Sequence, residues 1–154
     1  MSDDRLRDSP TRPRRVVRAG LLMGPTGDLS AVRLAGSSCG TCGETSLGIR
    51  ELCPNCGQDT VEAGPLGPRG VLWSFTIVRH RPPGNYRGPD PFVPFGLGLV
   101  ELPEGVRVLS VIDCRLEELR IGMELRFKPY LRHDDAEDVV IFAFEPVSFG
   151  DDVG

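Results

Sequence analysis

The sequence predicts a mainly β protein in which an N-terminal rubredoxin-like zinc ribbon is followed by a five-stranded OB-fold barrel. The ribbon is predicted by two Cys-x-x-Cys pairs, which lie ten residues apart between Cys39 and Cys56. The barrel is predicted by short segments after Gly70 in which hydrophobic and polar residues alternate with a period of two. Glycine and proline, at 19 and 14 residues, favour turns and short strands over long helices.

The chain of 154 residues has room for one ordinary domain or two small modules. We expect a disordered polar arm over residues 1–18 and a ribbon with a leading strand over 19–64. The OB-fold domain is expected over 65–148, and an acidic tail over 149–154. The stretch "GDLSAVRLAG" supplies the leading strand.

Composition and charge exclude several classes of function. The net charge is −4 and Lys128 is the only lysine, which makes the chain a poor general phosphate binder and disfavours a nucleic-acid partner. No apolar run approaches the roughly 18 residues of a membrane span. The start of the chain also lacks the features of an export signal, and we therefore expect a cytoplasmic protein without a membrane partner.

Three interpretations compete for the four thiols: a disulfide framework, a redox pair and a metal cage. A disulfide framework needs an oxidising compartment, and a redox motif is a single Cys-x-x-Cys at the start of a helix. Here each pair is followed by a glycine, Gly43 or Gly57, as in a rubredoxin-type knuckle. We therefore expect one structural zinc per chain, with iron as the alternative. The expected ligands are Cys39, Cys42, Cys53 and Cys56.

The barrel strands follow in order after "EAGPLGPRG" (62–70), which is typical of a linker. The expected strands are 71–78, 95–102, 106–112, 123–131 and 139–147, with one helical turn in "LEELRIG". In the first strand, one face is expected to be dominated by large hydrophobic residues. These are Val71, Trp73, Phe75 and Ile77.

The fourth strand is expected to point Met123, Leu125 and Phe127 inward. Cys114, at the end of the third strand, is expected to be a buried strand cysteine without a catalytic role.

The connection over residues 79–94 is too long for a hairpin and rich in proline. Loops of this length are most often functional or disordered, and proline argues against disorder, which leaves an idle loop as the alternative to a functional one. Cationic and aromatic groups together predict a surface that binds substrate or a partner. The expected contacts are Arg79, His80, Tyr86, Arg87 and Phe92.

The order of these motifs resembles the acyl-CoA-associated zinc-ribbon/OB-fold proteins, a family catalogued as a domain of unknown function. The resemblance runs from about Ala35 to Val147. Besides the cysteines, it rests on Arg50, Gly70, Ser74-Phe75-Thr76, Val100, Leu102, Gly105, Arg107 and Ile121-Gly122. The family's aromatic-Pro-Pro before the arginine is replaced here by Leu47-Gly48-Ile49.

The resemblance implies a non-catalytic accessory subunit, inactive alone, of a thiolase-superfamily enzyme. Such enzymes include thiolases, acyltransferases and the lipid-transfer-protein-like aldolases of steroid side-chain degradation. The partner would be a thiolase-fold subunit, and acyl-CoA would be contacted at a shared channel. Arg50 joins the expected binding residues on this basis. The residues agree, because the chain shows no Ser/His/Asp set, paired carboxylates or phosphate loop.

The alternative is a single-stranded nucleic-acid-binding zinc-ribbon/OB protein, because both folds serve that purpose. It would require a basic groove with interleaved aromatic residues, whereas this chain is acidic. An electron carrier with iron in the cage is a third class, which visible absorption would distinguish.

Overall fold

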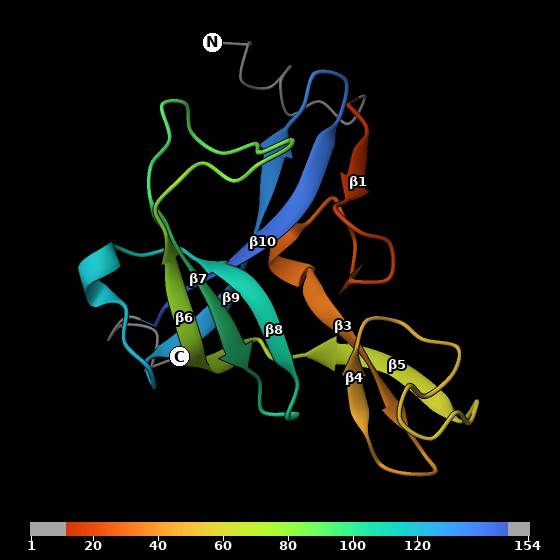
Figure 1. Cartoon of the computed structure of the whole chain (residues 1–154). Helices are drawn as coiled ribbons and strands as arrows, with labels where there is room; N and C mark the ends of the chain where they lie inside the picture. Colours follow the sequence, from red (N-terminus) through yellow and green to blue (C-terminus); the bar gives the residue numbers. More distant parts are fainter. Residues whose placement is uncertain (1–11, 148–154) are drawn as a thin grey trace. The chain divides into compact units, whose positions relative to one another are not determined.

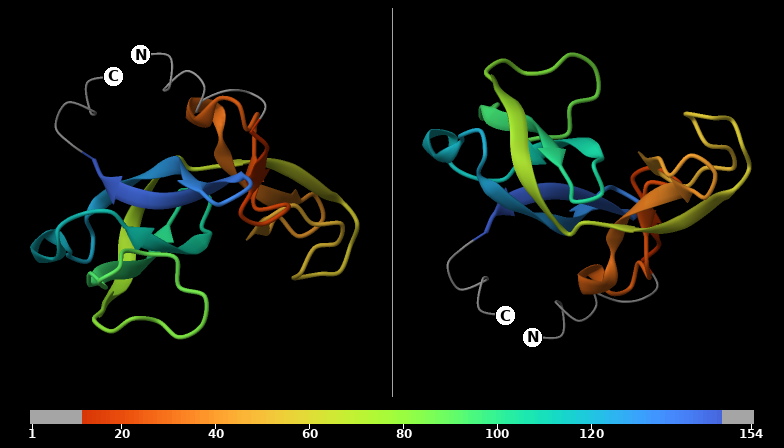
Figure 2. Two further views of the ribbon diagram at one scale, coloured as in Figure 1. Left: turned by 90° about the horizontal axis from the view of Figure 1, so that it is seen from above. Right: turned by 90° about the horizontal axis from the view of Figure 1, so that it is seen from below.

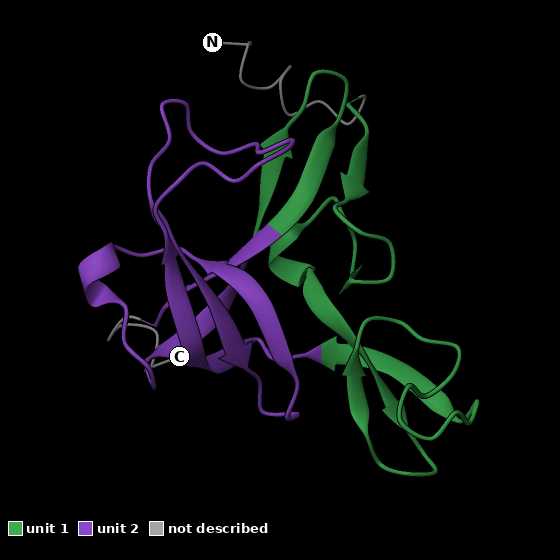
Figure 3. Cartoon of the chain, viewed as in Figure 1, with its two compact units in different colours: residues 1–65, 129–141 green, residues 66–128, 142–154 purple. Residues whose placement is uncertain are grey.

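The computed structural model describes residues 12–147, which divide into two units (Figure 3). The ribbon unit contains the residues up to 65 together with 129–141. The barrel unit contains 66–128 and the chain from 142 onward. The expected domain limits at 19–64 and 65–148 stay predictions, and the expected tail at 149–154 lies outside the described residues.

The ribbon unit contains short strands joined by turns and loops (Figure 1). β3 is the central strand, because β2 and β4 pair with it antiparallel and β5 also pairs with it. Leu34 and Ala35 of β3 are fully buried. The elements are β1 (Arg14–Val16), β2 (Leu22–Met23), η1 (Leu29–Ala31), β3 (Arg33–Cys39), β4 (Thr45–Leu47) and β5 (Val61–Leu66). The predicted leading strand is β3.

Two sequence-based predictions about this unit are wrong. The expected arm is described only from residue 12, and there Arg14–Val16 form β1, which pairs parallel with β10. Arg12 and Arg15 hold this short strand by ion pairs to Asp138 and Glu137, at 2.6 and 2.8 Å. The expected linker at 62–70 is mostly strand as well, because β5 gains its order from pairing with β3.

The barrel is closed by five strands in the order β10-β8-β7-β6-β9, with β9 also pairing with β10. β6, β7 and β8 form an antiparallel meander, whereas β10 pairs parallel with β8. This is the topology of an OB fold, so the predicted barrel is confirmed. The elements are β6 (Arg69–Val78), β7 (Phe95–Glu101), β8 (Arg107–Ile112), η2 (Leu116–Glu118), β9 (Glu124–His133) and β10 (Asp138–Pro146).

The predicted inward face of β9 is correct, since Met123, Leu125 and Phe127 are buried. Inside the barrel unit, Phe127 packs edge-on against Phe144 with ring centroids 5.8 Å apart. Across residues 12–147, the structure contains no helix with the length and hydrophobicity required to cross a bilayer.

The predicted apolar face of β6 is wrong, because the strand carries a β-bulge at Trp73 between Leu72 and Ser74. One inserted residue moves all later side chains to the opposite face of a strand. Leu72 is therefore fully buried before the bulge, while Trp73 is 46% exposed. After the bulge, Phe75 lies opposite the buried Gly98.

Candidate functional site

The first cysteine pair sits in a tight turn at the end of β3. Cys39 is the last residue of β3, and its carbonyl accepts a hydrogen bond from the Gly43 N–H at 3.0 Å. Gly43 has a φ of +79°, a conformation that favours glycine. The turn directs the amides of Thr41 and Cys42 at the Cys39 sulfur, at 3.4 and 3.5 Å. This is the geometry of a metal-binding knuckle.

The second pair repeats this geometry. Gly57 donates its N–H to the Cys53 carbonyl at 2.9 Å, again with a φ of +79°. The Asn55 amide points at the Cys53 sulfur at 3.4 Å. Each knuckle thus buries its first cysteine and exposes its second.

The two knuckles bring four sulfur atoms together. All four lie within 4.8 Å of one another, with Cys39 to Cys56 and Cys42 to Cys53 both at 3.6 Å. These separations are too long for disulfides, whose S–S bond is about 2.05 Å. A tetrahedral zinc site with bonds of about 2.3 Å has sulfurs roughly 3.8 Å apart. The donor set therefore fits one tetrahedral metal ion.

Electrostatics within the cluster favour a bound cation. Hydrogen bonds, the strongest from the Cys42 N–H and the next from the Thr60 hydroxyl, lower the pKa of the Cys39 thiol to about 6. The Gln58 N–H lowers the pKa of Cys56, but burial and the other three thiols outweigh it and raise that pKa to about 12. Four sulfurs this close become fully ionised when a dication offsets part of their negative charge. Such an ion, held by four thiolates, would keep no open coordination position for catalysis.

The connection between β6 and β7 extends away from the barrel strands as a long loop (Figure 2). Its expected binding residues separate into two groups. Tyr86 and Phe92 turn toward each other and toward Phe95, with ring centroids 5.7 to 6.2 Å apart. Gly88 lies so close to the Tyr86 ring that a Cβ there would be 1.9 Å from its hydroxyl. These two aromatic residues therefore brace the loop.

The polar residues of the loop form the second group. Arg79, His80 and Arg87 are exposed, and the two arginines give this part of the loop positive charge. Arg81 stacks on Tyr86, with its guanidinium carbon 5.6 Å from the ring centre. Their expected role in binding stays a prediction.

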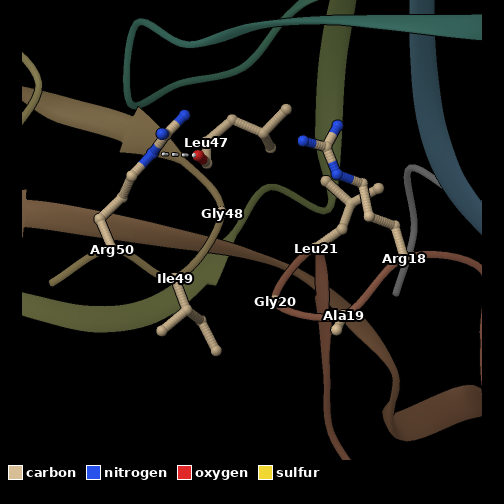
Figure 4. A pocket seen from close by; sticks show the side chains of 8 residues that line it. All are labelled: Arg18, Ala19, Gly20, Leu21, Leu47, Gly48, Ile49 and Arg50. Atoms are coloured by element: carbon tan, nitrogen blue, oxygen red, sulfur yellow. Dashed lines mark hydrogen bonds between the residues drawn. The ribbon is translucent and has the colours of Figure 1, made fainter.

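Arg50 lies elsewhere, in the ribbon unit. It follows β4 and lines a small pocket with Arg18 (Figure 4), a residue that sequence analysis missed. Its Nε donates a hydrogen bond to the Leu47 carbonyl at 3.2 Å. Nothing in the sequence near Arg18 indicates that it lies at the same pocket as Arg50, because this depends on how the loop 18–21 meets the loop 47–50.

The outer face of the barrel meander exposes large apolar side chains, which sequence analysis also missed. Leu109 is 61% exposed, and Val71, Trp73 and Val111 are exposed on the same face. The Arg107 guanidinium carbon lies 3.8 Å from the centre of the Trp73 ring, and Arg107 pairs with Glu101 at 2.9 Å. Contiguous exposed apolar surface of this kind marks interaction sites.

Cys114 differs from its prediction. It follows β8 and is only half-buried, and burial raises the pKa of its thiol. A thiol with a raised pKa is a poor nucleophile at neutral pH. His133 is the last residue of β9, and its Nδ1 lies 2.8 Å from the buried Asp138, which also pairs with Arg12.

A four-cysteine ribbon and an OB barrel on one chain define the class of protein, and comparisons with known proteins identify the family. The family model described as "ChsH2, C-terminal OB-fold domain" matches residues 64–128. A DUF35 domain-containing scaffold protein of Methanocaldococcus jannaschii is 30% identical over 119 residues, 74% of this chain and 82% of that protein. The chain therefore belongs to the DUF35 family, and the resemblance drawn from the sequence is confirmed.

Two further relatives are informative. The benzoylsuccinyl-CoA thiolase subunit BbsA of Geobacter metallireducens is 26% identical over 118 residues, which are 75% of each chain. The solved structure of the Ltp2-ChsH2(DUF35) aldolase contains a chain that is 23% identical, with a TM-score of 0.58. That match covers 74% of this chain and 84% of the other, and it supports the fold described above.

Proposed function

We propose that this protein is a non-catalytic accessory subunit that binds a thiolase-superfamily enzyme and helps to shape its acyl-CoA channel. The observation that carries the proposal is the similarity to BbsA, a subunit of a thiolase, over three quarters of both chains. The relatives named as scaffold proteins agree with it. An aldolase or acyltransferase of the same superfamily is an equally suitable partner class.

The cysteine cluster suits a structural role in this subunit. We assign it one zinc ion, bound by Cys39, Cys42, Cys53 and Cys56. Because the four thiolates would complete a tetrahedron, the ion would staple the ribbon and leave no position for substrate.

The exposed surfaces suit a partner. The apolar outer face of the barrel meander provides area for a protein contact. The exposed arginines of the loop, Arg79 and Arg87, provide charge for CoA phosphates or for carboxylates of the enzyme, and the exposed His80 provides a hydrogen-bonding group. Because Tyr86 and Phe92 fix the loop before binding, less conformational entropy is lost on association.

A direct test is co-expression of the chain with each thiolase-superfamily protein of its own genome. Size-exclusion chromatography with light scattering then measures the mass of the product. We expect a stable hetero-oligomer with one of them. A chain that elutes alone beside every candidate would contradict the proposal.

The second candidate function, binding of single-stranded nucleic acid, is favoured by one observation. Trp73 is exposed on the outer face of an OB barrel, where bases stack in nucleic-acid-binding OB folds. The net charge of −4 and the pairing of Arg107 with Glu101 oppose it. Quenching of Trp73 fluorescence by oligonucleotides at physiological salt would support this candidate, and we expect none.

A further inference from the structure

A small pocket in the ribbon unit lies where the loop 18–21 meets the loop 47–50 (Figure 4). The loops are joined by a hydrogen bond from the Ile49 N–H to the Gly20 carbonyl at 2.8 Å. Gly20 and Gly48 have φ values of +80° and +89°, which allow both loops to turn sharply here. The pocket is therefore fixed by backbone geometry, and its volume is about 150 Å³.

Two arginines flank this pocket. The side chains of Arg18 and Arg50 extend to the same side of it, whereas Ile49 points the opposite way (Figure 4). Within residues 12–147, neither guanidinium has an ion pair to a carboxylate. Arg15, in the same unit, is paired with Glu137. In a chain of net charge −4, the pocket is thus a local positive site.

The size of the pocket limits what can enter it. A cavity of about 150 Å³ holds a group the size of one side chain, whereas sites for whole small molecules run from roughly 300 to 1,000 Å³. An entire nucleotide is therefore too large. A single carboxylate is the right size, and the arginine fork matches its two oxygens.

The loop that carries Arg50 also favours a protein over a small anion. Ile49 and Leu52 are 53% and 58% exposed, and such apolar groups gain from contact with a protein surface. The guanidiniums would supply charge complementarity to an acidic side chain on that surface.

The geometry points to this pocket as a docking site for an Asp or Glu side chain of the thiolase-superfamily partner. The site rests on the proposed function and adds to it a defined contact on the ribbon unit. Arg18 is the decisive residue, because its side chain makes no hydrogen bond within residues 12–147 that would stabilise the fold. Arg50 has the second role of bonding the Leu47 carbonyl.

The test uses the dissociation constant of the complex, measured by isothermal titration at low and moderate salt. Arg18→Glu should weaken binding about tenfold to a hundredfold or more and reduce its salt dependence. Arg120→Glu is the matched control, because it makes the same charge change at an exposed position of the barrel unit. It should change the constant less than about threefold.

A second pair of variants tests the pocket without a charge change. Ala19 lines the pocket and is exposed, so Ala19→Phe should block it without unfolding the ribbon. Ala63→Phe, at an exposed position of β5, is its control. Arg50→Lys keeps the charge and loses the fork, so its affinity should lie between the wild type and Arg18→Glu. Metal content and melting temperature show that each variant remains folded.

The outcomes separate the two proposals. A wild-type complex that Arg18→Glu and Ala19→Phe leave unchanged would overturn the docking site and leave the proposed function intact. No complex with any thiolase-superfamily protein would overturn both. Saturable binding of coenzyme A to the chain alone, lost in Arg18→Glu, would make the pocket a phosphate site and overturn its assignment to a partner carboxylate.

Discussion

Replacing Cys53 with serine should release the tip of the ribbon while leaving the barrel folded. In residues 40–60, Cys53 is the one buried residue, at 3% exposure, so no apolar core holds this segment. Besides the pairing of β4 with β3, the cysteine cluster is what links the two knuckles of this segment. The barrel unit has a core of its own, which includes the fully buried Leu72, Val100 and Leu125.

The size of the effect follows from dividing the free energy of metal binding among the four sulfur ligands. Structural zinc contributes about 10–16 kcal/mol in zinc-finger peptides. Divided evenly among four thiolates, this is about 2.5–4 kcal/mol for each. Losing one should therefore weaken metal binding roughly 60- to 700-fold. Hydrogen exchange of residues 40–60 should accelerate in the same proportion when metal is limiting.

The assay combines competition with a chelating dye and hydrogen exchange read by mass spectrometry. Cys114→Ser is the matched control, because this thiol lies outside the cluster. It should leave metal affinity and exchange unchanged. Zinc binding by Cys53→Ser as tight as in the wild type would contradict this prediction. Unchanged hydrogen exchange in residues 40–60 would show that the metal does not hold this segment in place.

Three further predictions concern the loop between β6 and β7, the ion pairs that hold β1, and the apolar outer face of the barrel meander. Tyr86→Ala removes two ring contacts of about 0.5–1.5 kcal/mol each and should lower the melting temperature by several degrees. An unchanged melting temperature would show that these ring contacts do not stabilise the fold. Hydrogen bonds from His133 and Arg12 lower the pKa of Asp138 in the folded protein. The Asp138 carboxylate therefore stabilises the fold fully above its unfolded pKa of about 3.9. This stabilisation is lost as the pH falls through the lower pKa of the folded state. Melting temperature should therefore fall less steeply below about pH 4 in Asp138→Asn than in the wild type, and parallel curves would refute this. Leu109→Asp should leave melting unchanged, because the side chain is 61% exposed, but should weaken the partner complex at least about tenfold; wild-type assembly would remove the outer face from the interface.

The sequence predicted those features that depend on local spacing. The Cys-x-x-Cys-Gly spacing sets the knuckles, because the turn needs only the glycine that follows each pair. Alternation over "MELRFKPYL" gave the correct inward face of β9, since no irregularity interrupts that part of the strand.

Features that depend on distant parts of the chain were not predictable. The bulge at Trp73 reverses the face of β6, and only its pairing with β7 reveals it. β5 contains Gly64 and Pro65 and resembles a linker, but pairing with β3 makes it a strand. The pocket between Arg18 and Arg50 joins residues far apart in sequence through two glycine turns.

The central claim is that this chain supports catalysis by a thiolase-superfamily enzyme without performing it. The most direct test measures acyl-CoA turnover by the chain alone, by its partner alone and by the co-expressed complex. We expect no turnover by the chain, little by the partner and full activity in the complex. Turnover by the chain alone, or a partner equally active and stable without it, would contradict the claim.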